Sequence, residues 1–232
     1  MAAPTYAAVA AALEAAGLVA RGGFHPDPAD AVPALADGAP AATLVLAGDA
    51  GGRMWPAFAA ARPDDPHPLD AWTRATVDRV AAALGARPLY PFEGPPYHPF
   101  QRWAQRAEPA APSPLGVLIH PDHGLWHAYR AALVFAARLE DVPPRADRPA
   151  PCATCAGRPC LATCPVSAFT DAGYDVERCV DHITSPAGRA CREGGCLARR
   201  ACPVGRPYGP AQQAFHMQAF VRSRLRAREG RG

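Results

Sequence analysis

The chain has 232 residues, a hydrophobic content of 49% and a formal net charge of +3 at pH 7. This length accommodates one domain, or a domain with a smaller module, and the apolar content is sufficient for a buried core. No apolar run approaches the roughly 20 residues that a membrane helix needs, so we expect a protein that does not span a bilayer. All 24 basic residues are arginines, and so small a net charge does not predict nucleic-acid binding.

Helix and strand patterns alternate along the first part of the chain. Helices are predicted over 5–16, 55–61, 68–84 and 101–107, and strands or extended segments over 18–24, 42–48, 87–92, 115–121 and 125–135. The first helix has Thr5 as its N-cap, and Gly17 is suited to end it. Apolar residues recur at helical spacing in the helix over 68–84, which indicates one buried face.

The last two of these segments flank a short turn. Residues 115–121 end in a histidine and a proline, and Asp122-His123-Gly124 separates them from 125–135. Two apolar segments that meet at such a turn predict a β-hairpin. Because alanine is a poor strand former, a helix remains the alternative for 125–135.

All eight cysteines lie between Cys152 and Cys202. The first four form a C-x2-C-x4-C-x3-C-P run. That run resembles the bacterial ferredoxin pattern C-x2-C-x2-C-x3-C-P, in which the fourth cysteine binds the other cluster. The pattern therefore predicts two [4Fe–4S] clusters with crossed ligands. The first cluster would take Cys152, Cys155, Cys160 and Cys202, and the second would take Cys164, Cys179, Cys191 and Cys196.

Disulfides and zinc are the alternatives for these cysteines. Disulfides suit a secreted chain, whereas the segment after Met1 is rich in alanine and lacks the basic start and long apolar core of a signal peptide. Zinc sites usually pair two separated cysteine doublets or include histidine. The crowding of four cysteines into one turn-rich run favours iron–sulfur clusters, and their sensitivity to oxygen suggests a cytoplasmic protein.

Three stretches before the cysteines resemble the cobalamin-processing family of the cobalamin C type. They are His67-Pro-Leu-Asp70, the run from Leu115 through Ile119-His120-Pro121 and Gly124-Leu-Trp126 to Arg130, and Leu139-Glu-Asp-Val142-Pro-Pro144. The resemblance covers roughly residues 10–148. It implies an α+β fold with a flavin-reductase-like or nitroreductase-like sheet, and cobalamin as a cofactor.

The junction with the cysteines, together with Glu177-Arg178-Cys179-Val-Asp-His-Ile183-Thr, is similar to epoxyqueuosine reductase. In that family a cobalamin domain precedes a two-cluster ferredoxin. This chain lacks the Gly-Trp-Ile-Gly-Lys segment and the long tail of the queuosine enzyme, which argues against action on tRNA.

These resemblances imply three regions: a cobalamin C type α+β domain over 1–148, a small dicluster ferredoxin-like module over 149–210, and a basic C-terminal helix or tail over 211–232. The implied corrinoid contacts are His120, His123, Trp126, His127, Tyr129 and Arg130. Of these, His120 and Arg130 are the catalytic candidates. The alternatives are structural hydrogen bonds for the histidines, core packing for the aromatic residues and an ordinary salt bridge for Arg130.

The sequence thus predicts an iron–sulfur oxidoreductase that delivers electrons to a corrinoid, for cobalamin reduction or removal of its upper ligand. It would take its electrons from an external donor protein. The alternatives are a ferredoxin-type carrier without cobalamin chemistry, a reductase of the epoxyqueuosine reductase type and a flavin enzyme. Five arginines near the C-terminus suggest a solvated tail or a docking surface for an acidic partner; they are Arg222, Arg224, Arg226, Arg228 and Arg231.

Overall fold

The computed structural model describes residues 4–170 and 172–229. The described residues form two compact units. The first unit combines the chain up to Ala110 with His127–Arg148. The second combines Ala111–Trp126 with the chain from Pro149 onward. Residues 111–126, which the sequence analysis places in the first domain, therefore group with the cysteine-rich part of the chain.

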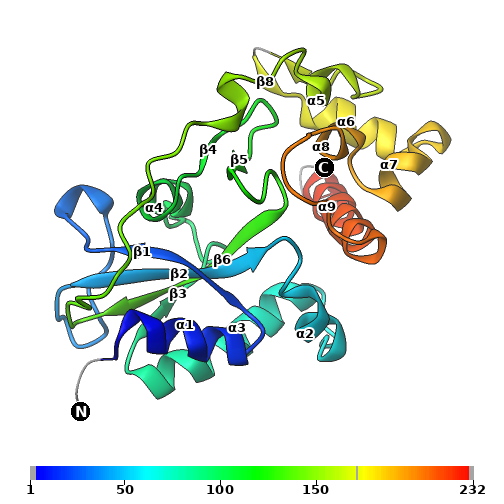
Figure 1. Ribbon diagram of the computed structural model, residues 1–232. Coiled ribbons are helices and arrows are strands. Elements are labelled where there is room, and N and C mark those ends of the chain that lie inside the picture. The colour runs from blue at the N-terminus through cyan, green and yellow to red at the C-terminus, as the bar shows by residue number, and fades with distance from the viewer. Residues whose placement is uncertain (1–3, 171, 230–232) are drawn as a thin grey trace. The chain divides into compact units, whose positions relative to one another are not determined.

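The first unit is built on a four-stranded antiparallel sheet (Figure 1). The strands, in sheet order, are β1 (Val19–Phe24), β2 (Thr43–Ala50), β6 (His127–Phe135) and β3 (Arg87–Leu89). β2 and β6 form the centre and pair from Thr43 opposite Phe135 to Ala50 opposite His127. Every residue of β2 is buried, which requires that both faces of the sheet be covered.

Helices provide that cover. They are α1 (Tyr6–Ala15), α2 (Trp55–Ala60), α3 (Pro68–Leu84) and α4 (Phe100–Ala107), with a short 3-10 turn, η1, at Pro28–Asp30. Figure 1 shows α1 and α3 on one face of the sheet and α4 on the other. The Thr5 hydroxyl caps α1 by accepting a hydrogen bond from the Ala8 N–H at 3.1 Å. α3 begins at a proline, and Gly85, with a left-handed φ of 65°, caps its C-terminal end.

The predicted helices and strands of this unit are confirmed, each within a few residues of its expected bounds. Residues 127–135 form a strand and not the alternative helix. Alanine is a poor strand former, but this strand lies between β2 and β3 and its last five residues are buried. Tertiary pairing therefore outweighs the local propensity.

The predicted hairpin over 115–135 is wrong. β5 (Leu118–Ile119) pairs with β4 (Ala111–Pro112) and not with β6. A single bridge between His120 and Gly124 closes the turn. The apolar pattern correctly indicates two extended segments, but a pattern along one strand does not identify the strand with which it pairs.

The second unit consists mainly of short helices. Besides β4 and β5 it contains η2 (Pro151–Ala153), α5 (Pro159–Ala162), the β7–β8 hairpin (Phe169–Thr170 with Gly173–Tyr174), α6 (Val176–Thr184), η3 (Pro186–Gly188), α7 (Arg189–Gly194), α8 (Leu197–Arg200) and α9 (Pro210–Glu229). α9 packs against α6 and α7. The basic end of the chain is thus helical through Glu229, and Arg228 pairs there with Glu177 and Asp181. Arg231 lies outside the described residues.

Two glycines hold residues 111–126 against the cysteine-rich chain. A Cβ added to Gly124 would overlap the carbonyl of Val204, and one added to Gly205 would overlap the carbonyl of His123. Both glycines also have left-handed φ angles, 55° and 77°. The two backbones therefore approach more closely than any side chain would permit. No helix in the described parts of the chain is long and apolar enough to cross a membrane.

We predict that Gly124→Ala destabilises the protein far more than Gly116→Ala. Both glycines have left-handed φ angles, so each substitution incurs backbone strain of about 1–2 kcal/mol. Only Gly124 adds a clash with neighbouring backbone, since nothing lies within 4 Å of a Cβ on Gly116. We expect the Gly124→Ala loss to reach about 3 kcal/mol or more, measured by urea unfolding. Equal losses would contradict the close contact.

Candidate functional site

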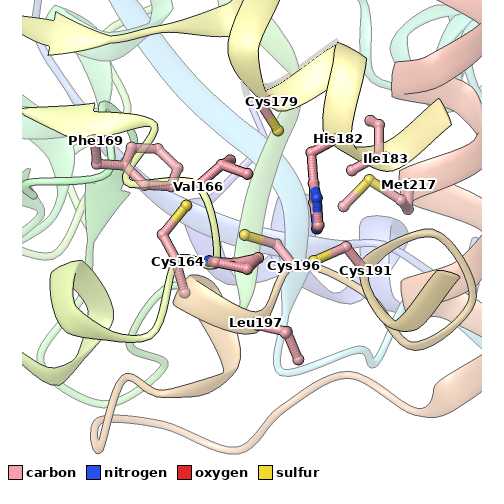
Figure 2. Close-up of a pocket in the computed structure, with 12 residues that line it drawn as sticks. Cys164, Val166, Phe169, Cys179, His182, Ile183, Cys191, Cys196, Leu197 and Met217 are labelled. Atoms are coloured by element: carbon pink, nitrogen blue, oxygen red, sulfur yellow. The ribbon is translucent and has the colours of Figure 1, made fainter. Parts of the chain in front are cut away.

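The eight cysteines are all free thiols, and they form two sets in the second unit. Four of them, Cys164, Cys179, Cys191 and Cys196, line one pocket. Figure 2 shows their sulfur atoms around this pocket, with Val166 and Phe169 on one side and His182, Ile183 and Met217 on the other. Apart from His182, the lining between the thiols is apolar; it consists of Pro165, Val166, Phe169, Ile183, Leu197, Ala198 and Met217.

Local structure explains how this second set converges. Cys164 follows the short helix α5, and the Ala168 N–H donates a hydrogen bond to its Sγ at 3.3 Å. Cys179 lies in the first turns of α6, which Asp175 caps. Cys191 lies on α7 and is buried, while Cys196 is the N-cap of α8. Four separate segments of the chain, each in or beside a short helix, thus contribute one thiol each.

The remaining thiols form the first set. Burial raises the pKa of Cys152, and its neighbours Cys202, Cys160 and Cys155 raise it further. Burial also raises the pKa of Cys160, opposed by the Leu161 N–H, and Cys202 and Cys155 again add to the rise. Cys202 is therefore an electrostatic neighbour of Cys152 and Cys160, although all four cysteines of the second set lie between Cys160 and Cys202 in sequence.

The second set shows the same mutual influence. Burial raises the pKa of Cys179, a hydrogen bond from Tyr174 opposes the rise, and Cys164 and Cys191 add to it. Burial raises the pKa of Cys196, opposed by the Arg199 N–H, while Cys191 and Cys179 raise it further.

An apolar cluster lies against both sets. Leu115, Ile119, Leu125 and Ala198 form its buried centre. The cysteines packed against it are Cys152, Cys160, Cys164, Cys196 and Cys202. Three of the four central residues come from segment 111–126, so this segment provides most of the buried centre against which these thiols pack. Among the described residues, no three His, Cys, Asp or Glu side chains are grouped as ligands of one metal ion.

The six predicted corrinoid contacts divide between the two units. In the second unit, the ring of His120 is buried and stacks on that of His123 with centroids 4.7 Å apart. Trp126 is also buried, and the Arg199 guanidinium lies 4.5 Å from its ring centroid. The Tyr208 ring meets Trp126 edge-on at 5.4 Å. The indole Nε1 of Trp126 has no hydrogen-bond partner among the described residues.

In the first unit, His127 and Tyr129 belong to a buried charged network. Its centre is Arg21, which is only 1% exposed and forms two hydrogen bonds to Glu108, at 3.0 and 2.6 Å. The Tyr129 hydroxyl donates to the same carboxylate at 2.8 Å, and the Arg21 guanidinium lies over the Tyr129 ring. His127 Nδ1 lies 3.4 Å from Arg21. Burial raises the pKa of Tyr129, so its hydroxyl remains a donor.

Arg130 pairs with an acidic residue of α3. Its guanidinium forms an ion pair with Asp70 and a 3.3 Å hydrogen bond to the Thr73 hydroxyl. The guanidinium also lies 5.6 Å from the ring centroid of Phe92. These are the contacts expected of an ordinary salt bridge, and the role of Arg130 at a corrinoid stays a prediction.

Comparison with solved structures identifies the fold. The chain has the fold of CblC. It matches the B12-trafficking protein CblC of C. elegans, a homologue of human MMACHC, with a TM-score of 0.52 and 12% sequence identity over 92% of this chain and 96% of that one. No model of a known protein family matches this chain, and no curated protein matches its sequence.

Two structures of epoxyqueuosine reductase match less closely than CblC. The Bacillus subtilis enzyme has a TM-score of 0.45 and 16% identity, and the match covers 76% of this chain and 50% of that one. A complex with an epoxyqueuosine-modified tRNA stem loop has a TM-score of 0.49 and 13% identity over 92% of this chain and 67% of that one. The match to CblC shows the fold, a mixture of helix and antiparallel sheet, as the sequence predicts.

Several residues around the candidate site were not singled out from the sequence. Arg199 and Tyr208 both contact the Trp126 ring. Arg21 and Glu108 likewise bind Tyr129. No local motif marks these residues, because each contact joins segments that lie apart in sequence.

We predict that Glu108→Ala strongly destabilises the first unit, because it removes the carboxylate from the buried Arg21 guanidinium. Breaking a buried ion pair in this way costs about 3–5 kcal/mol. Glu14→Ala is the control: it breaks an Arg–Glu pair with Arg53 whose side chains are 59% and 69% exposed, and it should cost at most about 1 kcal/mol. Urea unfolding measures both, and similar losses would contradict the buried network.

Proposed function

We propose that this protein is an iron–sulfur redox protein that passes electrons through two [4Fe–4S] clusters to a bound corrinoid. The electrons would reduce the cobalt or remove its upper axial ligand. The observation that carries the proposal is the grouping of eight free thiols into two sets of four. The fold shared with a B12-trafficking protein supports the corrinoid part.

The donor set fits a cluster better than a single ion. A tetrahedral zinc, with Zn–S bonds of about 2.3 Å, would draw four thiolates to within about 3.8 Å of one another. A [4Fe–4S] core keeps its thiolates farther apart, because its irons and sulfides lie between them. The four thiols of the second set come from separate segments and line one pocket with apolar side chains between them, an arrangement that suits the larger core. The proposed ligands are Cys152, Cys155, Cys160 and Cys202 for the first cluster, and Cys164, Cys179, Cys191 and Cys196 for the second.

When bound, such clusters supply single electrons at low potential, and a corrinoid supplies the reducible cobalt. The chain itself would control the surroundings of the thiolates. Leu115, Ile119 and Leu125 exclude water from one side of the cysteines. The Ala168 N–H donates a hydrogen bond to the Cys164 sulfur. Burial and hydrogen bonding are the two properties by which a protein adjusts cluster potentials.

The corrinoid contacts remain those predicted from the sequence: His120, His123, Trp126, His127, Tyr129 and Arg130. Arg130 is the candidate for an anionic group of the corrinoid or of a thiol co-substrate, because its planar guanidinium forms paired hydrogen bonds. On binding, Arg130 would then replace its ion pair with Asp70 by contacts to the ligand.

A ferredoxin-type electron carrier is the second candidate. It is favoured by the internal contacts of the predicted corrinoid residues, since Tyr129 is bound to Glu108 and Arg130 to Asp70. Such a carrier would contain both clusters but would not change the spectrum of an added cobalamin.

The ligand sets generate a prediction about cysteine variants. Protein prepared without oxygen is expected to hold about eight irons and eight sulfides per chain, and its colour should bleach with dithionite. Cys202→Ala should abolish the same paramagnetic signal as Cys152→Ala, whereas Cys164→Ala should abolish the signal that Cys191→Ala removes. Loss of one signal in both Cys202→Ala and Cys164→Ala would refute the crossed sets, and zinc in place of iron would refute the proposed function.

Anaerobic titration with hydroxocobalamin tests the corrinoid part. We expect a spectral change toward base-off cobalamin, weakened in Arg130→Ala about tenfold or more and less in Arg130→Lys, since a charged hydrogen bond contributes about 1.5–3 kcal/mol. Both variants should keep their full iron content, because Arg130 lies outside the cysteine unit.

Asp70→Asn is the control for that titration, because it disrupts the ion pair while keeping Arg130. If Arg130 only stabilises the fold, Asp70→Asn and Arg130→Ala should lower stability similarly and leave cobalamin binding unchanged. No spectral change with the wild-type protein would leave the electron carrier as the function.

A further inference from the structure

Among the described residues that line the pocket of the second set of thiols, His182 alone has a side chain with an N–H group. The rest of the lining consists of the four thiols and of apolar side chains. Figure 2 shows the imidazole on the side of the pocket that also holds Ile183 and Met217. An otherwise apolar pocket thus contains, besides its thiols, one strong hydrogen-bond donor.

The spacing along α6 places His182 beside one of these thiols. His182 and Ile183 follow Cys179 by three and four residues, so the three side chains lie on one face of the helix. All three line the pocket. The adjacent Asp181 is not part of the lining and forms an ion pair with Arg228 of α9 at 2.8 Å. The helix therefore directs a thiol and an imidazole into the same pocket.

Several contacts fix the backbone at His182. The Ser185 N–H and hydroxyl both donate to the His182 carbonyl, at 3.0 and 2.8 Å. The Arg192 guanidinium donates to the next carbonyl, that of Ile183, at 2.8 Å. Gly188 packs so closely that a Cβ there would lie 2.0 Å from the His182 carbonyl oxygen. These contacts use only the backbone of His182, and its ring forms no hydrogen bond within residues 4–170 and 172–229. The ring nitrogens are therefore available to a group bound in the pocket.

We infer that the ring N–H of His182 raises the reduction potential of the cluster proposed for the second set of thiols. The inference rests on the proposed function. An imidazole carries at least one N–H in either protonation state, whereas thiolate and sulfide sulfurs only accept hydrogen bonds. Reduction adds one negative charge to the cluster and its thiolates, so a donor beside them stabilises the reduced form more than the oxidised form. The hydrogen bond from Ala168 to Cys164 comes from the backbone, so His182 is the donor that substitution can remove.

The test compares His182→Leu, which removes the N–H, with His182→Gln, which keeps an N–H donor. We expect both variants to retain their full iron. In His182→Leu the equilibrium constant for reduction of the second cluster should fall about threefold or more, which is about 28 mV at 59 mV per tenfold for one electron. His182→Gln should stay closer to the wild type. An anaerobic redox titration at one fixed pH, followed by electron paramagnetic resonance, measures both potentials, with the two signals assigned from the cysteine variants. The first cluster serves as the internal control.

Met217→Leu is the matched control. It changes another residue of the same lining but removes no N–H and nearly conserves volume, so it should leave both potentials unchanged. An unchanged second potential in His182→Leu, an equal shift of both clusters, or the same shift in Met217→Leu or His182→Gln would overturn the inference. Loss of iron from the His182 variants would overturn it as well, by assigning the histidine to assembly of the site. A wild-type protein without two clusters would instead contradict the proposed function.

Discussion

The cysteine-rich unit depends on the close approach of two backbones. The turn at His123 and Gly124 meets Val204 and Gly205 at a distance that only glycine permits, because a Cβ on either glycine would overlap the opposite carbonyl. That contact holds segment 111–126 beside the cysteines. The segment supplies Leu115, Ile119 and Leu125, and the cysteine-rich chain contributes only Ala198 to the same buried cluster. Five of the eight cysteines pack against this cluster.

Burial gives the two sets of thiols a specific electrostatic character. It raises the pKa of Cys152, Cys160, Cys179 and Cys196, and neighbouring cysteines raise each pKa further. Four adjacent thiolates in such surroundings would require a positively charged partner. The first unit solves a similar problem differently, because its buried guanidinium, Arg21, is compensated within the chain by Glu108.

The sequence was most informative where the signals are local. Capping by Thr5, the proline at the start of α3 and the left-handed Gly85 at its end define helices through contacts within a few residues. The spacing of the cysteines is a local signal of the same kind, and the cluster-binding run that it predicts stays a prediction. Strand pairing was harder to predict from the sequence. Residues 115–121 and 125–135 are consecutive extended segments, yet their strands belong to different sheets.

The sequence by itself therefore determined the helices and central strands, the α+β class and the presence of thiols as side chains that can bind metal. These follow from residue type and short-range spacing. Only the tertiary structure decided that segment 111–126 packs with the cysteines, that Arg130 binds Asp70 and that Arg21 binds Glu108. Each of these contacts depends on how the backbone path brings together separate segments or turns one side chain toward another. Residue types alone do not specify that path, because each side chain has several possible partners of suitable charge or size along the chain.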